Sequence, residues 1–445
     1  MNRRTSLISL ITAGALLAAV SPALGAGDTA GADHAPGPKE RNAHWVAAWT
    51  SMPQLTEPSN MPPAPFTQDD SVLTDTTLRQ TVHVSAGGDH IRLRFSNAFG
   101  GAVLPLTKVS VALPLDGRAG TGAIREGTTR SVTFGGSASV TVPAGSQAVS
   151  DPLDFRLAPG SNLTATVYLA TGQASTAITS HPGSRTTSYL RSGDHVQDPD
   201  LPGAATTDHW YFLSGVEAWS SSTTSATAVL GDSLTDGRGS TTNGNDRWPD
   251  VLQQRLAAGG GAVRTSVVNQ AAGGNRLLND GLGPNGLARL DRDVLAQSGV
   301  DRLIVFEGVN DIGTAAAEPA AQKQAADDVI AAYGQIITRA HALGIRVYGA
   351  TLTPFGGNTG YDDPDGYREG ARQKVNTWIR TGGRFDGVID FDRTVRDPEN
   401  PRALRASVDV GDHLHLNPAG YRILAEAVPA RLFWPSPLPA GFGYN

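Results

Sequence analysis

Apolar and polar positions alternate along the first half of the chain. Residues 91–95 alternate Ile, Leu and Phe with two arginines, and residues 163–169 follow the same pattern. A period of two places apolar side chains on one face of a strand and polar side chains on the other. Many short strands separated by turn residues predict an all-β sandwich or jelly-roll-like domain over residues 45–219. The pair Gly87-Gly88 predicts a tight hairpin between two of these strands.

The pattern changes after a small polar segment, residues 220–225, which we interpret as a linker. Short apolar runs then alternate with helical patterns. The segment Asp327 to His341 carries apolar residues at helical spacing and is closed by Gly344. Strand-helix alternation predicts an α/β domain over residues 226–432, with a mostly parallel sheet covered on both faces. Five apolar runs predict its buried strands: 226–230, 265–268, 303–306, 347–351 and 388–391.

The first 26 residues are typical of a signal peptide. Arg3 and Arg4 precede an apolar run that ends at Val20, and small residues follow near Gly25. The run is shorter than the ~20 residues that span a membrane, so we expect no stable membrane anchor. The predicted protein is therefore secreted (extracellular), through Sec or twin-arginine export. A flexible N-terminus is expected at residues 27–44 and a C-terminal tail at residues 433–445.

Composition and charge exclude several classes of protein. A length of 445 residues indicates two or three domains, and 39% hydrophobic with 18% charged residues indicates a globular core. The net charge of -6, without any Lys/Arg run, disfavours a nucleic-acid partner. The chain has no cysteine, so disulfides do not contribute to its stability.

Two polar motifs carry the residues of a nucleophilic site. Gly231-Asp232-Ser233-Leu234 follows the first predicted parallel strand, and such strands end at the ligand-binding edge of the sheet. Asp412 stands three residues before His415, a spacing that lets its carboxylate orient the imidazole toward a serine. We therefore predict Ser233 as nucleophile, His415 as base and Asp412 as its partner. His413 is expected to be a solvated loop residue.

A third group of residues supplies hydrogen-bond donors. Attack on an ester creates an oxyanion, which preorganised N–H groups stabilise. Gly274 follows the second predicted parallel strand and Asn310 follows the third. The backbone amides of Ser233 and Gly274 and the side chain of Asn310 are the three predicted donors, because all arise at carboxyl ends of strands.

These motifs resemble the four blocks of the GDSL/SGNH hydrolase family, in order, over about residues 226–429. The blocks are Gly231 to Leu234, Asn269 to Gly274, Gly308 to Asp311 and Asp412 to His415. Ala271, Gly273 and Leu416 depart from the family pattern without touching a predicted catalytic atom. Segments 353–357 and 385–392 resemble its secreted, lysophospholipase-like branch. The resemblance implies a flavodoxin-like three-layer domain with a five-stranded parallel sheet, ester hydrolysis, and no cofactor or metal.

The predicted function is a secreted serine esterase that deacylates a carbohydrate or polysaccharide. A lipid esterase remains an alternative, as does a non-catalytic carbohydrate-binding protein. The substrate is a small-molecule or polysaccharide ester, and the oligomeric state is not predicted. Activity should rise as His415 loses its proton, with a midpoint at about pH 6 to 7. A long irregular stretch of the β domain offers groups suited to binding a sugar: His181, Arg185, Tyr189, His195, His209 and Trp210.

Overall fold

The computed structural model describes residues 43–259 and 264–434. The predicted signal peptide, nearly all of the predicted flexible N-terminus and nearly all of the predicted tail lie outside the described residues. Two of the predicted boundaries near the chain ends need correction. The first strand, β1, spans Ala43–Thr50, so the β domain begins two residues before the predicted start. Phe433 closes a 3-10 turn, Ala430–Phe433, and is buried, so the predicted tail begins inside the fold.

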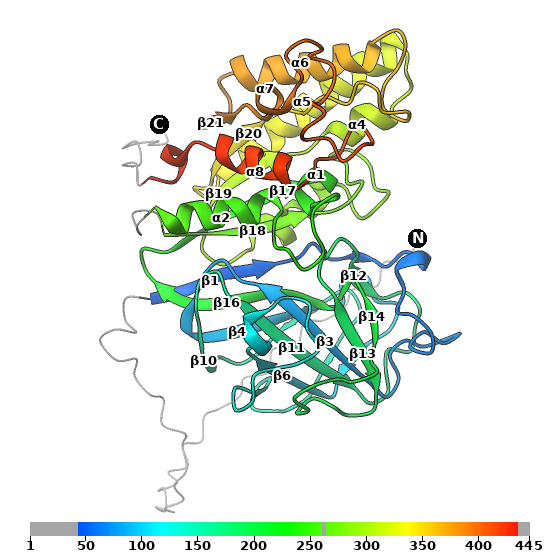
Figure 1. Ribbon diagram of the computed structural model, residues 1–445, viewed down its shortest axis with the longest axis vertical. Coiled ribbons are helices and arrows are strands. Elements are labelled where there is room, and N and C mark those ends of the chain that lie inside the picture. The colour runs from blue at the N-terminus through cyan, green and yellow to red at the C-terminus, as the bar shows by residue number, and fades with distance from the viewer. Residues whose placement is uncertain (1–42, 260–263, 435–445) are drawn as a thin grey trace, which may run out of the picture. The chain divides into compact units, whose positions relative to one another are not determined.

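Antiparallel sheets form the first part of the described chain (Figure 1). One five-stranded sheet consists of β1, β16 (Leu213–Ser221), β4 (Gly88–Ser96) and β10 (Leu153–Leu157), with β9 (Gln147–Val149) paired to β4. A six-stranded sheet has the order β14 (Ala205–Thr207), β13 (Ser188–Ser192), β3 (Thr76–His83), β11 (Asn162–Leu169), β6 (Lys108–Ala112) and β7 (Arg130–Val132). Two smaller sheets complete the described β part: β15 (Trp210–Tyr211), β12 (Thr179–His181) and β2 (Gln54–Leu55), then β5 (Leu104–Leu106) and β8 (Val140–Val142).

The predicted hairpin at Gly87-Gly88 is wrong, because β3 and β4 belong to different sheets. The glycines serve the crossing between sheets instead. A Cβ on Gly87 would lie 2.2 Å from the carbonyl oxygen of Leu157, and one on Gly88 would lie 2.2 Å from that of Trp219. Glycine is required here because two backbone segments approach closely. A glycine pair is also typical of a two-residue turn, so the sequence alone does not distinguish the two cases.

The five predicted parallel strands are all present, with shifted ends. They form one five-stranded parallel sheet in the order β18 (Thr265–Ala271), β17 (Ser225–Gly231), β19 (Val300–Phe306), β20 (Arg346–Ala350) and β21 (Gly387–Ile389). The first strand in sequence thus lies second in the sheet, an order found in doubly wound α/β folds. The resulting break between β17 and its two neighbours is the place where such sheets bind ligands.

Two groups of packed helices accompany the parallel sheet (Figure 1). Helix α2 packs against α8, and α5 packs against α6. The predicted helix at 327–341 begins eight residues earlier, at Pro319, because the buried positions of its first two turns are Gln322, Ala325 and Ala326, which carry no large apolar side chain. Pro319 at the first turn starts it. The described helices are α1 (Ser233–Asp236), α2 (Trp248–Ala258), α3 (Gly286–Leu290), α4 (Val309–Thr314), α5 (Pro319–His341), α6 (Tyr367–Thr381), α7 (Phe391–Val395) and α8 (Pro418–Ala427), and a π-helical turn spans Asp291–Leu295.

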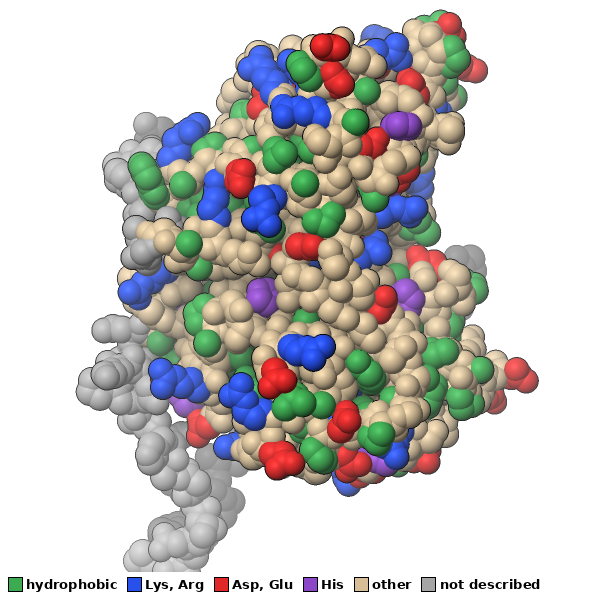
Figure 2. All heavy atoms as spheres, viewed as in Figure 1, with side chains coloured by type: hydrophobic (Ala, Val, Ile, Leu, Met, Phe, Trp, Pro, Cys, Tyr) green, Lys and Arg blue, Asp and Glu red, His purple; other side chains and the backbone are tan. Residues whose placement is uncertain are grey.

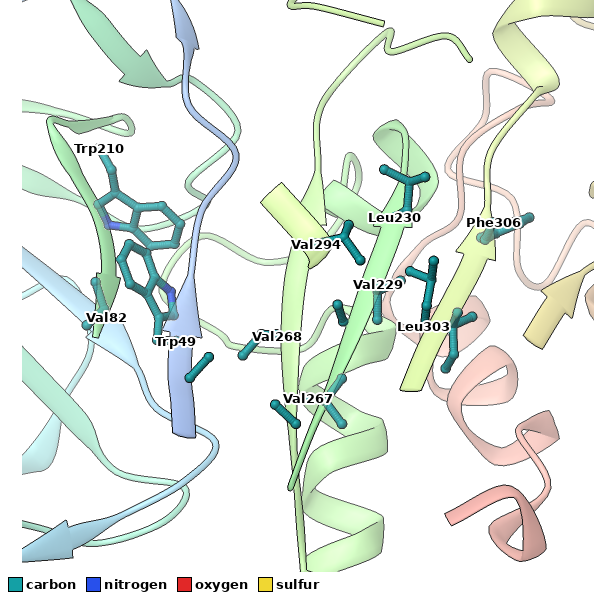
Figure 3. Close-up of a cluster of buried hydrophobic side chains, with 14 of the residues drawn as sticks. Trp49, Val82, Trp210, Val229, Leu230, Val267, Val268, Val294, Leu303 and Phe306 are labelled. Atoms are coloured by element: carbon teal, nitrogen blue, oxygen red, sulfur yellow. The ribbon is translucent and has the colours of Figure 1, made fainter. Parts of the chain in front are cut away.

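The β part and the parallel sheet share one hydrophobic core. Strand β1 contacts β18, and Figure 3 shows Trp49 and Trp210 on one side of this contact and Val268 on the other. The amide of Ala47 donates to the carbonyl of Ser298 at 2.8 Å. The hydroxyl of Ser85 donates to the carbonyl of Val267 at 2.7 Å. A shared core with direct hydrogen bonds fixes the two parts against each other.

The predicted linker is shorter than 220–225. Strand β16 continues to Ser221 and β17 begins at Ser225, so only residues 222–224 form the turn between them. The linker was predicted too long because the ends of both strands are polar.

On the viewed face, cationic and anionic side chains are interspersed (Figure 2). Among the described helices, none is long and apolar enough to cross a bilayer.

Candidate active site

Ser233 stands at the carboxyl end of β17 and is the first residue of α1. Asp232 caps this short helix, and its carboxylate accepts a hydrogen bond from the amide of Leu234 at 2.9 Å. A Cβ on Gly231 would lie 2.6 Å from the hydroxyl of Thr235, so only glycine permits the tight strand-to-helix turn. The turn places the Ser233 side chain at the mouth of the sheet.

The structure brings Ser233, His415 and Asp412 into one hydrogen-bonded row. The hydroxyl of Ser233 lies 2.8 Å from Nε2 of His415, and Nδ1 of His415 lies 2.6 Å from Oδ2 of Asp412. The other oxygen of Asp412 accepts hydrogen bonds from the amides of His415 at 2.8 Å and Leu414 at 3.0 Å. The carboxylate is therefore locked onto the loop that carries the histidine. His413 is mostly exposed and bonds Asp409.

Burial and charge set the protonation of this row. Burial lowers the pKa of His415 below its usual value, while Asp412 opposes the shift and the cations Arg238 and Arg185 add to it. The pKa of Asp412 is lowered as well, because hydrogen bonds from His415 outweigh the burial that raises it. A neutral imidazole beside an ionised carboxylate is the state that accepts a proton from serine.

Two of the three predicted oxyanion donors are backbone amides at neighbouring strand ends. Within residues 43–259 and 264–434, no acceptor takes a hydrogen bond from the amide of Ser233 or of Gly274. Gly274 has a φ of 70°, in the region that favours glycine. Both residues line the same cavity as His415. Unpaired amides at a cavity wall are available to bind developing negative charge.

The third predicted donor, Asn310, is buried and held from both ends of its amide. Its Oδ1 accepts a hydrogen bond from the hydroxyl of Tyr361 at 2.6 Å, and its Nδ2 donates to the carbonyl of Asn275 at 2.8 Å. One N–H of the two on Nδ2 therefore remains. A Cβ on Gly313 would lie 1.9 Å from the ring of Tyr361, so that glycine makes room for the ring. Sequence reasoning missed Tyr361, which lies in a loop without a motif.

A cluster of buried acids lies behind the serine. Burial raises the pKa of Asp232 to about 7 and that of Asp311 to about 6. Burial also raises the pKa of Glu307, whose two carboxylate oxygens have no hydrogen-bond partner among the described residues. Arg289 is the buried cation nearby, 4.0 Å from Glu307, and it donates to the carbonyl of Gly231 at 3.3 Å. Sequence reasoning missed this cluster, although Asp232 and Asp311 lie in the motifs that carry Ser233 and Asn310.

The β part reaches the oxyanion segment through a buried histidine–carboxylate hydrogen bond. Nε2 of His181, on β12, lies 2.9 Å from Oδ1 of Asp236, on α1. Oδ2 of Asp236 accepts a hydrogen bond from the amide of Gly273 at 3.1 Å, and Gly273 precedes Gly274. Nδ1 of His181 lies 3.0 Å from the carbonyl oxygen of Met52. Both ring nitrogens face acceptors, so the imidazole is held from two sides.

A cavity of about 650 Å³ opens above Ser233 and His415 and is lined by both parts of the chain. Of the residues predicted to bind a sugar, Arg185 and His209 line this cavity. The prediction is wrong for His181 and Trp210, which are buried and pack on each other in a stacked geometry. Tyr189 and His195 bond Gly120 and Asp198 and are not among the lining residues.

Residues 229–423 match the model of the GDSL-like Lipase/Acylhydrolase family. Together with the parallel sheet and the Ser-His-Asp row, this match defines the class of the protein. The chain contains a GDSL-like acylhydrolase domain and is an ester-hydrolysing serine hydrolase.

Solved structures similar to this chain cover the same domain. A putative lipolytic protein of the G-D-S-L family from Desulfitobacterium hafniense is 19% identical, with a TM-score of 0.35, over 47% of this chain and 99% of its own. The acetyl xylan esterase AlAXEase is 21% identical, with a TM-score of 0.35, over 45% and 96%. A catalytic mutant of Axe2, an acetylxylan esterase from Geobacillus stearothermophilus, is 20% identical, with a TM-score of 0.35, over 46% and 91%. None of the curated proteins matches this chain.

Proposed function

We propose that this protein hydrolyses carboxylic esters through an acyl-enzyme formed on Ser233. The observation that carries the proposal is the continuous row from the Ser233 hydroxyl through His415 to Asp412, with both hydrogen bonds between 2.6 and 2.8 Å. His415 accepts the serine proton as the oxygen attacks the carbonyl carbon. The resulting imidazolium is stabilised by Asp412 and then gives its proton to the leaving alcohol.

The oxyanion is held by the amides of Ser233 and Gly274 and by the free N–H of Asn310. Tyr361 fixes the amide of Asn310 in the orientation that aims nitrogen, not oxygen, at the oxyanion. Preorganised donors of this kind act mainly on the transition state, because the charge exists only there. Water activated by His415 then attacks the acyl-enzyme and releases the acid. The proposed reaction uses no metal or cofactor.

The favoured substrate is an acylated carbohydrate or polysaccharide. Most of the side chains that line the cavity are polar, among them Gln54, Asn60, His209 and Asn358. A second cavity of about 520 Å³ is also lined by Asn358, so space for an extended substrate continues beyond the serine. A lipid esterase is the second candidate, because Leu282 and Leu414 give the first cavity an apolar portion. We also propose that the protein is exported by the N-terminal segment.

The test is acetate release from acetylated xylan, measured beside p-nitrophenyl esters of increasing chain length and lysophosphatidylcholine. A preference for acetyl groups and for the polymer supports carbohydrate deacylation, whereas a preference for long acyl chains supports the lipid esterase. The Ser233→Ala variant is the control for each substrate. Binding of xylan without hydrolysis of any ester would instead favour a non-catalytic carbohydrate-binding protein.

A further inference from the structure

Two guanidinium groups enter the wall of the cavity above the serine. Arg185 belongs to the segment between β12 and β13, in the β part, and Arg238 follows α1. Both line the cavity together with Ser233 and His415. Both also act electrostatically on His415, whose pKa each of them lowers. The two cations therefore lie near the reacting atoms, on opposite parts of the fold.

Neither guanidinium has a hydrogen-bond or ion-pair partner in the described parts of the chain, and Nε of Arg185 is also shielded from solvent. The carboxylates of the same cavity are all engaged. Glu57 accepts hydrogen bonds from Gln54 and Asn60. Asp236 and Asp412 are bound to the histidines described above. The cavity thus presents two guanidinium groups whose donors have no protein partner, whereas each of its three carboxylates already accepts hydrogen bonds from described residues.

The backbone of Arg185 is held in an uncommon conformation. Its φ is 50°, in the left-handed region that a residue with a long side chain rarely adopts. Its carbonyl accepts a hydrogen bond from the amide of Asn243 at 2.9 Å, and the buried hydroxyl of Ser184 bonds the carbonyl of Thr186 at 2.8 Å. Strain of this kind persists where surrounding structure enforces it, and it gathers at functional sites. Here the enforced turn directs an arginine toward the cavity.

We propose that the cavity binds an acidic carbohydrate ester, with Arg185 and Arg238 holding a carboxylate of the sugar beside the scissile ester. Guanidinium groups suit this task because their planar set of donors matches the two oxygens of a carboxylate. The polar lining favours a uronate over the phosphate of a lysophospholipid, which offers the same charge on an apolar chain. The proposal rests on the proposed function of Ser233 and adds the class of its substrate.

Matched substrates test the proposal. Acetylated methyl glucuronoside and acetylated methyl glucoside carry the same ester and differ in the carboxylate. The ratio of their kcat/KM values is measured at about pH 8, above the pKa of an ordinary histidine. We expect the wild type to favour the charged sugar, and Arg185→Gln or Arg238→Gln to lower the ratio about tenfold each, since hydrogen bonds to charged groups are the strong ones. Arg118→Gln, an exposed arginine outside the cavity, leaves the ratio unchanged.

A lipid pair, lysophosphatidic acid and monoacylglycerol, separates the two sources of negative charge. A charge preference in the sugar pair that both glutamine variants reduce supports the proposal, and lysine variants should retain part of it. A preference confined to the lipid pair, or a sugar ratio that neither variant changes, overturns it. Calorimetry of Ser233→Ala with methyl glucuronoside and methyl glucoside needs no turnover. Absence of cleavage of every ester would refute the proposed function. Equal binding of the two sugars in calorimetry would refute the anion site, whether or not esters are cleaved.

Discussion

Replacing His181 with leucine tests whether the β part positions the oxyanion segment. Leucine fills a similar volume but removes the hydrogen bonds to Asp236 and to the carbonyl of Met52. Within the described residues, the carboxylate of Asp236 then keeps a hydrogen bond only from the amide of Gly273, at 3.1 Å. The side chains of His181 and Asp236 are 4% and 3% exposed, so both groups are largely shielded from solvent.

The size of the effect follows from this burial. Removing the partner of a buried carboxylate costs up to about 3–5 kcal/mol of stability, because the group that remains loses a hydrogen bond in the interior. The loss leaves the Asp236 carboxylate less firmly held, and this loosens the backbone next to Gly274. Since complete loss of an oxyanion donor costs roughly 10²–10³ in kcat, a displaced donor should lower kcat by about 10- to 100-fold.

Steady-state hydrolysis of p-nitrophenyl acetate, with the Tm recorded alongside, is the assay. We expect kcat to fall and KM to stay within about twofold, because an oxyanion donor acts on the transition state. His181→Gln, which keeps a donor toward Asp236, should restore part of kcat. His195→Leu is the matched control, because it breaks another His-Asp pair, to Asp198, outside the cavity. If His181→Leu lowers the Tm but keeps the kcat of the wild type, the positioning role is refuted.

Four further predictions concern the site itself. Ser233→Ala should fold normally and lose a factor on the order of 10⁴ to 10⁶ in ester turnover; residual wild-type rates would remove it from the mechanism. Asn310→Ala should lower kcat by about 10²–10³ with little change in KM, and a rise in KM alone would make it a binding residue. Because burial lowers the pKa of His415, activity should rise with pH through a midpoint below about 6.5, and removing either Arg185 or Arg238 should move that midpoint upward in a pH-rate profile. Glu307→Gln should raise the Tm more at about pH 8 than at about pH 5. The pKa of Glu307 is higher in the folded state than in the unfolded state, so the unfolded state binds fewer protons and the stability of the wild type falls as pH rises. Equal Tm changes at both pH values would contradict this reasoning.

The sequence predicted the parallel sheet because buried strands are continuous apolar runs, whose identity does not depend on their partners. The same holds for the strand-end motifs, which the structure brings together around Ser233 and His415. Pairing between distant strands could not be predicted. Gly87-Gly88 permits a crossing as readily as a hairpin, and only the neighbours Leu157 and Trp219 decide between them. The start of α5 was likewise hidden, because the buried positions of its first two turns are glutamine and alanine and give only a weak apolar pattern.

His181 and Arg185 show why the sequence could not assign separate roles to residues at the boundary between the two parts of the chain. Both residues lie in one short stretch of the β part, four positions apart, and the sequence suggested the same role for each. The structure separates them. His181 ends a strand and turns into the shared core, where it can only bond protein groups such as Asp236. Arg185 lies beyond the strand, and its own left-handed backbone conformation turns the chain toward the cavity. One stretch therefore supplies a group that holds the oxyanion segment and a group that faces the substrate. A fragment lacking the β part would lose both, along with the core between β1 and β18.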